Sequence, residues 1–153
     1  MIIRRALVKD TKGVRRLNRK WKKEYPEAFI DGDYTFKGIR ASIKKRQIFI
    51  AEDEDNIIGY VKIIVRKRDT PMKRWGLRKR QKFLEVTDMF VKKDYRNKGA
   101  GVKLMETAEN YARERKIKTI VLSSEGSSGE NLISFYHRRG FKINYTRMFK
   151  ILL

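Results

Sequence analysis

The chain has 153 residues, 41% hydrophobic and 37% charged, a composition typical of one globular domain long enough to bury a core. Lysine and arginine number 39 against 18 aspartate and glutamate, a formal net charge of +21 that should attract polyanions and repel polycations. The lack of cysteine and the single histidine exclude disulfides, thiol catalysis and thiolate or histidine metal sites, and no apolar run approaches the roughly 20 residues of a membrane span. We therefore expect a single domain over residues 1–153, in the cytoplasm, with no secretory signal and no metal.

The first half of the chain alternates strand-like and helix-like patterns. Residues 2–7 predict a strand, and apolar residues at helical spacing predict a helix over 14–25. A second helix is predicted over 36–45. The runs 47–52 and 57–65, separated by a turn of acidic residues and asparagine, predict a hairpin.

Two segments concentrate the positive charge. Lys12–Lys23 holds seven basic residues and no acidic one, and Arg66–Lys82 holds nine basic residues and one aspartate. We predict a long exposed loop for the second segment. It is either a solvated, mobile connection or a contact surface for substrate or RNA, where Trp75 could stack on a base.

The second half continues the alternation. Residues 83–91 predict the central strand, 102–116 an amphipathic helix, and 119–123 a buried strand. A last helix is predicted over 130–139, capped by a glycine, and 141–152 a closing hairpin or one bent strand.

The turn between the central strand and the amphipathic helix has the pattern Arg-x-x-Gly-x-Gly, ending in Gly99 and Gly101. Glycines at the mouth of a helix let backbone approach a ligand, and the free N–H groups there suit a phosphate. A dinucleotide-binding turn would need a third glycine where Leu104 stands, and a nucleotide-hydrolysing loop would need Lys-Ser/Thr where Val102 follows. An ordinary tight turn and a phosphate-binding turn both remain.

The flanking residues narrow the choice. Asp-Met-Phe-Val at 88–91, followed by Asp-Tyr-Arg-Asn-Lys-Gly-Ala-Gly at 94–101, closely resembles the coenzyme A loop of the GCN5-related N-acetyltransferase (GNAT) superfamily. Residues 131–141, an Asn, a Tyr five residues on and then Gly-Phe, are similar to its second signature. The resemblance covers nearly the whole chain and specifies no subfamily. It implies an α/β sandwich with a mixed central sheet of about six to seven strands, one splayed strand pair and about four helices.

The resemblance also implies a site for acetyl-coenzyme A (acetyl-CoA). The residues expected to contact this cosubstrate are Met89, Phe90, Val91, Arg96, Asn97, Lys98, Gly99, Ala100, Gly101, Val102 and Asn131. The N–H groups of residues 97–102 would converge on the pyrophosphate, and Phe90 and Val91 would pair with the pantetheine arm through their backbone. Asn131 would act from the start of its helix, where the alternative role is a plain helix cap.

Three residues are candidates for catalysis. Tyr136 matches the family's usual general acid, which would help the thiolate leave, although a core tyrosine is the alternative. Glu85 matches the base of the histone-acetylating branch, and Asp88 an acid of polyamine-acetylating relatives; base action through water is the third option. An unbulged strand would aim these two carboxylates at opposite faces, and a bulge could change that.

The resemblance implies transfer of an acetyl group to a primary amine, on a protein N-terminus, a lysine or a small molecule. The basic surface favours an acidic protein or peptide as acceptor. The rival is a binding module that contacts RNA or the ribosome through Lys12–Lys23 and Arg66–Lys82, and a third option is a non-catalytic cofactor sensor. The oligomeric state is open, with a dimer among the options.

Overall fold

The computed structural model describes residues 1–26, 33–123 and 130–143, and the chain forms two compact units, Met1–Ser123 and Ser124–Leu153. The strands of the first unit are β1 Ile2–Arg5, β2 Ile48–Asp53, β3 Asn56–Lys67, β4 Lys82–Val91 and β5 Ile120–Leu122. Its α-helices are α1 Thr11–Glu24, α2 Phe36–Lys44 and α3 Ala100–Glu114. Short 3-10 helices, η1 Val8–Asp10, η2 Lys73–Trp75 and η3 Lys93–Tyr95, join them. The second unit holds α4 Glu130–Arg138.

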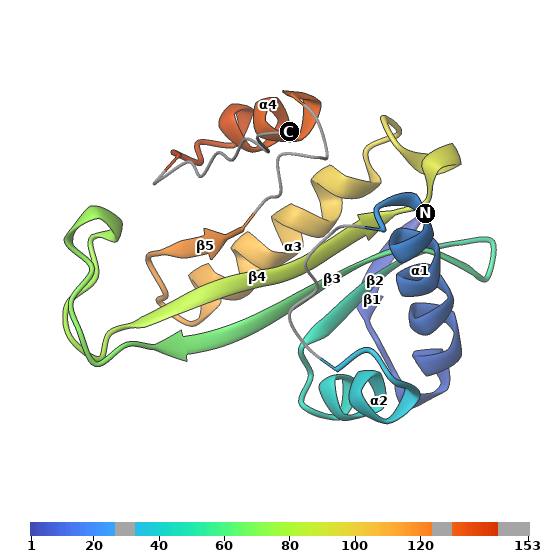
Figure 1. Ribbon diagram of the computed structural model, residues 1–153, viewed down its shortest axis with the longest axis horizontal. Helices are drawn as coiled ribbons and strands as arrows, with labels where there is room; N and C mark the ends of the chain where they lie inside the picture. The colour runs from blue at the N-terminus through green and yellow to red at the C-terminus, as the bar shows by residue number, and fades with distance from the viewer. Residues whose placement is uncertain (27–32, 124–129, 144–153) are drawn as a thin grey trace, which may run out of the picture. The chain divides into compact units, whose positions relative to one another are not determined.

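The five described strands form one sheet in the order β1-β2-β3-β4-β5 (Figure 1). Neighbours are antiparallel except β4 and β5, which are parallel, so the predicted mixed sheet is confirmed. A sixth or seventh strand was expected over 141–152. Residues 141–143 are not in a strand, and 144–153 lie outside the described residues.

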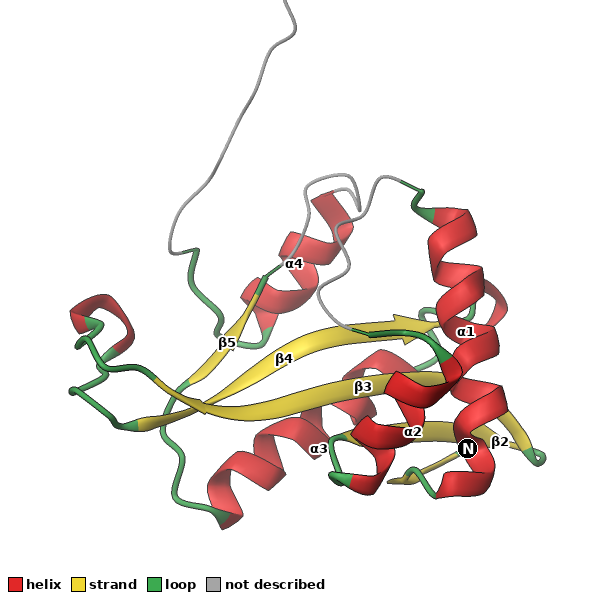
Figure 2. Cartoon of the chain, turned by 60° about the horizontal axis from the view of Figure 1, so that its bottom comes forward, coloured by secondary structure: helices red, strands yellow, loops and turns green. Residues whose placement is uncertain are grey.

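Helices cover both faces of this sheet (Figure 2). On one face, Val14 and Leu17 of α1 join a buried cluster with Tyr60 of β3 and Phe90 of β4. On the other face lies α3, which buries its apolar stripe; its Leu104 stands close enough to β3 that a Cβ on Gly59 would be 3.3 Å from it. Each helix therefore packs its apolar stripe against the sheet, as the amphipathic periodicity predicts.

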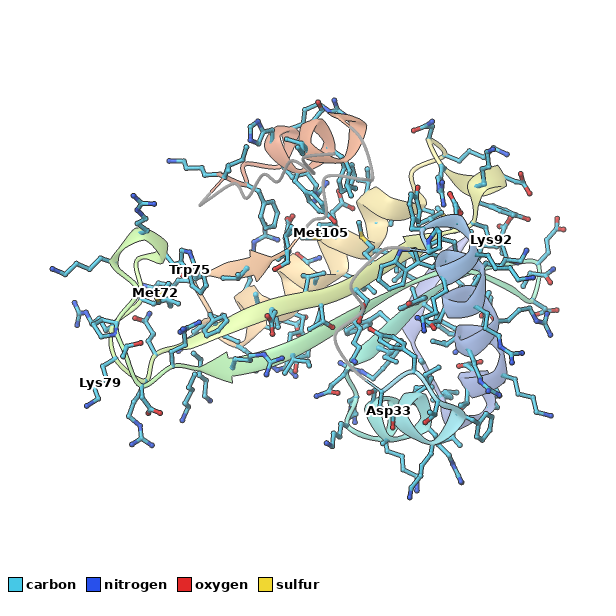
Figure 3. The ribbon with its side chains drawn as sticks, in the orientation of Figure 1. Asp33, Met72, Trp75, Lys79, Lys92 and Met105 are labelled. Atoms are coloured by element: carbon cyan, nitrogen blue, oxygen red, sulfur yellow. The ribbon has the colours of Figure 1, made fainter. Side chains whose placement is uncertain are left out.

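The segment Arg66–Lys82, called the arm below, contains the exposed connection between strands that the sequence predicts, and this connection has local structure of its own. β3 runs on to Lys67 and β4 begins at Lys82, and a backbone bridge joins Met72 to Leu77 at the tip. Trp75 lies on the arm (Figure 3), and its ring packs edge-on against Phe83 with centroids 5.9 Å apart. Because this contact uses the Trp75 ring, the prediction that Trp75 stacks on a base gains no support.

The second unit explains the Gly-Phe pair of the second signature. Gly140 has φ +82°, its N–H donates to the His137 carbonyl at 2.9 Å, and the Phe141 N–H donates to the Tyr136 carbonyl at 3.1 Å. These two bonds form a Schellman motif, so the predicted glycine cap is confirmed. The Phe141 ring then packs edge-on against Tyr136 at 5.7 Å between centroids. Glycine and phenylalanine thus fix the position of Tyr136 on α4.

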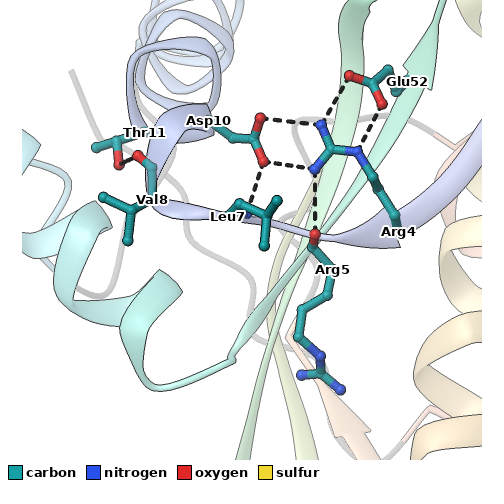
Figure 4. Close-up of polar contacts among 7 residues, drawn as sticks. All are labelled: Arg4, Arg5, Leu7, Val8, Asp10, Thr11 and Glu52. Atoms are coloured by element: carbon teal, nitrogen blue, oxygen red, sulfur yellow. Dashed lines mark hydrogen bonds and ion pairs between the residues drawn. The ribbon is translucent and has the colours of Figure 1, made fainter.

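A charged cluster fastens the N-terminal strand to the sheet (Figure 4). Arg4 donates two hydrogen bonds to Asp10, at 2.7 and 3.1 Å, and two to Glu52, at 2.7 and 2.9 Å. The Leu7 N–H also donates to Asp10 at 2.7 Å. Burial opposes ionisation of Asp10, but the hydrogen bonds from Arg4 and Leu7 outweigh burial and lower the pKa of this carboxyl.

This cluster makes stability depend on pH. A lowered pKa in the folded state means that the contribution of Asp10 is complete above the ordinary aspartate pKa and is lost as pH falls through the folded value. Asp10→Asn should therefore lower the free energy of unfolding by about 2 kcal/mol at pH 7, and the difference from wild type should shrink below about pH 4. Urea unfolding at pH 7 and at pH 3 measures both values. Asp55→Asn, in the exposed hairpin turn, is the control and should cost little at either pH.

Candidate active site

The turn that connects β4 to α3 has a left-handed backbone at two points. Asn97 has φ +58° and Gly99, the N-cap of α3, has φ +85°. The first backbone bond into the helix runs from the Lys103 N–H to the Gly99 carbonyl at 3.0 Å. The N–H groups of the first helical turn, Ala100 to Val102, therefore point out of the helix end, which is the positive end of the helix dipole. A Cβ on Gly99 would meet no atom within 4 Å, so the space above this glycine is open.

The side chain of Arg96 binds within the protein. Its Nη1 and Nη2 donate to the two carboxylate oxygens of Glu24 on α1, and its Nε donates to the Val91 carbonyl at 2.9 Å. The bond to Glu24 raises the pKa of Arg96 and lowers the pKa of Glu24. Arg96 thus ties the turn to α1, and its predicted contact with the cosubstrate stays a prediction.

The predicted contact residues divide between the two faces of β4. Phe90 is buried in the cluster under α1, so only its backbone can reach a ligand on the α3 side. Met89 and Val91 alternate with it on the α3 face, and Val91 lies beside Gly59. In the turn, Ala100 is buried while Lys98 and Val102 are exposed. The side chain of Asn131 lies outside the described part of the chain.

Among the described residues, the end of β4 pairs with a strand on one side only. The β4–β5 ladder pairs residues 84–86 with 120–122. Residues 87–91 continue β4, and among the described residues no strand pairs with them on the β5 side. A strand edge of this kind presents backbone N–H and C=O groups to a partner. It is what the predicted splayed pair requires, and it leads directly into the open turn.

A bulge places both candidate bases on one face. Tyr60, Lys62 and Ile64 alternate along β3 and therefore share a face. Opposite them stand Phe90, Asp88 and Glu85, because the register shifts by one residue at Thr87. Glu85 and Asp88 consequently lie on the α1 face, three residues apart in sequence but with the same orientation.

The two carboxylates differ in exposure and partners. The Glu85 side chain is 28% exposed and accepts a hydrogen bond from Arg66 Nε, which leaves its second oxygen for another donor. Asp88 is only 4% exposed and accepts a bond from the Thr87 hydroxyl at 3.0 Å. Burial, and then the negative charge of Asp88, raise the pKa of Tyr60. An acceptor amine can thus reach Glu85 more easily than Asp88.

Lys62 is a residue of this face that the sequence analysis missed. It is 7% exposed, stands opposite Asp88 in the ladder, and its ammonium lies 5.0 Å from the Tyr34 ring centroid. A lysine inside a strand usually indicates a solvated position. The signal that could have revealed it is the apolar run on both sides, Gly-Tyr-Val before it and Ile-Ile-Val after it.

Tyr136 on α4 is described within its own unit. It is 9% exposed, and its ring packs edge-on against Phe135 and Phe141. Burial raises its pKa to about 12. The phenol is therefore protonated at neutral pH and can donate a hydrogen bond, while full transfer of its proton to a thiolate of pKa about 8.5 would be uphill.

The described residues hold no cluster of three or more histidine, cysteine or acidic side chains that could bind a metal ion. They also include no helix long and apolar enough to cross a membrane. The single domain and the cytoplasmic location expected from the sequence stay predictions.

Comparison with known proteins agrees with this geometry. Residues 14–141 match the model of the acetyltransferase (GNAT) family. The uncharacterized N-acetyltransferase YhfO of Bacillus subtilis is 27% identical over 143 residues, which cover 93% of this chain and 90% of that protein.

Solved structures share the fold. A mutant of the BH1408 protein from Bacillus halodurans aligns with a TM-score of 0.78 at 23% identity, over 100% of both chains. A possible acetyltransferase from Clostridium difficile aligns with a TM-score of 0.72 at 20% identity, over 99% of this chain and 97% of that one. The open turn after β4, the strand edge that no described strand covers and the match over most of the chain lead to one conclusion: the protein is an acetyltransferase and belongs to the GNAT family.

Proposed function

We propose that this acetyltransferase takes its acetyl group from acetyl-CoA and transfers it to a primary amine. The observation that supports this most directly is the open space above Gly99 at the start of α3, close in sequence to the end of β4, which has no strand on its β5 side among the described residues. A diphosphate fits such a helix end because both the N–H groups and the helix dipole favour negative charge. The edge of β4 would bind the amide-containing arm of the same ligand.

The bound acetyl-CoA would supply the thioester, and the side chains would handle protons. An amine of pKa about 10.4 is neutral in only roughly one molecule in a few thousand at pH 7, so a base assists the reaction. Glu85 is our candidate for that base, since its second oxygen is free of Arg66 and partly exposed. As the N–C bond forms and the C–S bond breaks, Tyr136 would stabilise the departing thiolate by a hydrogen bond.

Gly99→Ala tests the proposed ligand site against a matched control. Gly99 and Gly76 both have left-handed backbones with open space around a Cβ, so alanine at either should cost about 1 kcal/mol of stability. Only Gly99 lies at the proposed diphosphate site, whereas Gly76 lies on the arm. We expect Gly99→Ala to raise the Kd for acetyl-CoA about tenfold in calorimetry, with Gly76→Ala unchanged. Equal affinity in both variants would place the cosubstrate elsewhere.

A further inference from the structure

A cavity of about 340 Å³ opens at the end of β4. Four lysines line it, two from the C-terminal half of α1 and two from the residues that follow β4, and Phe90 forms its apolar wall. These lysines are Lys20, Lys23, Lys92 and Lys93. The chain thus brings together cations that are about 70 residues apart in sequence. Figure 3 shows Lys92 at the end of the sheet opposite to the arm that carries Lys79.

The charge of this cavity is poorly compensated. Glu24 belongs to its wall, but both of its oxygens accept hydrogen bonds from Arg96. Asp94 is the remaining acid of the lining, and among the described residues no ion pair joins it to any of the four lysines. Burial, and then the charges of Lys20 and Arg16, lower the pKa of Lys92, and the smaller opposing effect of the Asp94 charge does not cancel them. Like charges held together in this way favour the binding of an anion.

The cavity lies on the side of the sheet where an acceptor would bind. Phe90 belongs to the α1 face, and Glu85 and Asp88 share that face because of the bulge at Thr87. α3, whose first turn is the proposed diphosphate site, packs on the opposite face. The anion expected in the cavity therefore comes with the acceptor rather than with the cosubstrate.

We propose that the cavity lined by Lys20, Lys23, Lys92 and Lys93 binds a carboxylate of the acceptor, so that the enzyme acetylates amines carried by acidic peptide segments. This inference rests on the proposed function. Phe90 and Glu85 stand opposite Tyr60 and Ile64, which are four residues apart on β3, or about 13 Å at the usual rise of a strand. An extended acceptor would span that distance with four to five residues, so the carboxylate should lie several positions from the amine.

The test compares two double variants that remove the same charge. Lys20→Gln with Lys23→Gln changes the cavity, and Lys73→Gln with Lys79→Gln changes exposed lysines of the arm. The acceptors are a hexapeptide with glutamate at positions 3 to 6 and its glutamine counterpart. We expect the cavity variant to raise KM for the acidic peptide about tenfold, with kcat and the KM of the glutamine peptide within about twofold. The arm variant should have the kcat and KM of wild type for both peptides.

Binding measurements separate this inference from the proposed function. Fluorescence anisotropy of the Nα-acetylated acidic peptide reports the cavity without catalysis, and the cavity variant should weaken this binding about tenfold. If wild type neither binds acetyl-CoA nor acetylates a peptide, yet the cavity variant binds the acidic peptide about tenfold more weakly than wild type, the proposed function fails and the carboxylate site stands. Unchanged peptide binding overturns the inference. The inference is also overturned if the cavity variant has a higher Kd for coenzyme A than wild type but an unchanged Kd for dephospho-coenzyme A. That result would assign the cavity to the cosubstrate's phosphate. An equal loss of oligouridylate binding would also overturn it, because the cavity would then attract any polyanion.

Discussion

Tyr136→Phe is expected to lower kcat by about 100-fold while the Kd for acetyl-CoA stays within twofold of wild type. The substitution removes one hydroxyl and keeps the ring that packs against Phe135 and Phe141, so the Schellman motif and the melting temperature should not change. Only the proposed interaction with the departing sulfur, which would strengthen as negative charge develops, is lost. Steady-state kinetics with calorimetry on the same preparations measures both quantities.

The pH dependence refines this expectation. Because burial raises the pKa of Tyr136 to about 12, the phenol stays protonated below about pH 10. Ionisation of Tyr136 should therefore cause no rise or fall in the plot of kcat against pH between pH 6 and 9. The 100-fold difference in kcat between wild type and Tyr136→Phe should be constant over that range. A deficit in kcat below twofold would assign Tyr136 to packing alone. A deficit that varies with pH would mean that the phenol ionises in the working range.

The elements that bury a periodic apolar face could be predicted from the sequence. The apolar stripe of α3 and the glycine cap of α4 both depend on residues within one or two turns of helix, so the local sequence is enough to predict them. The start of α3 was placed two residues late, because Ala100 and Gly101 look like turn residues, although Ala100 is buried as the first residue of the helix.

Features set by distant pairing could not be predicted. The bulge at Thr87 exists because β4 pairs with β3 on both sides of it, and one strand's sequence does not reveal its partner's register. The motif predicts that Arg96 contacts a ligand, but its side chain binds the carboxylate of Glu24 on α1, which is 72 residues away in sequence. The arm was correctly predicted as an exposed connection, but its many cations gave no sign that Leu77, 5% exposed at the tip, is buried. In each case a long-range contact decided the role of a residue that local pattern left open.

Glu85→Gln is expected to lower kcat/KM about 100-fold at pH 7, with a deficit that narrows toward pH 10. The narrowing follows because an acceptor amine loses its own proton near that pH and no longer needs a base. Arg66→Ala is the matched control. It removes the hydrogen bond to Glu85 but leaves the carboxylate, so it should cost less than tenfold at pH 7.

Asp88→Asn should act on stability rather than on rate. Asp88 is almost fully buried opposite the buried Lys62, and an amide there leaves that ammonium with less compensating charge. We expect the free energy of unfolding to fall by about 2 kcal/mol, with kcat/KM at 10 °C below wild type by less than fivefold. If Asp88→Asn instead lowers kcat/KM 100-fold and this deficit narrows at high pH, Asp88 is the base despite the greater exposure of Glu85. If neither variant shows a deficit of that form, water alone carries the proton, since both carboxylates on this face of β4 would have been tested.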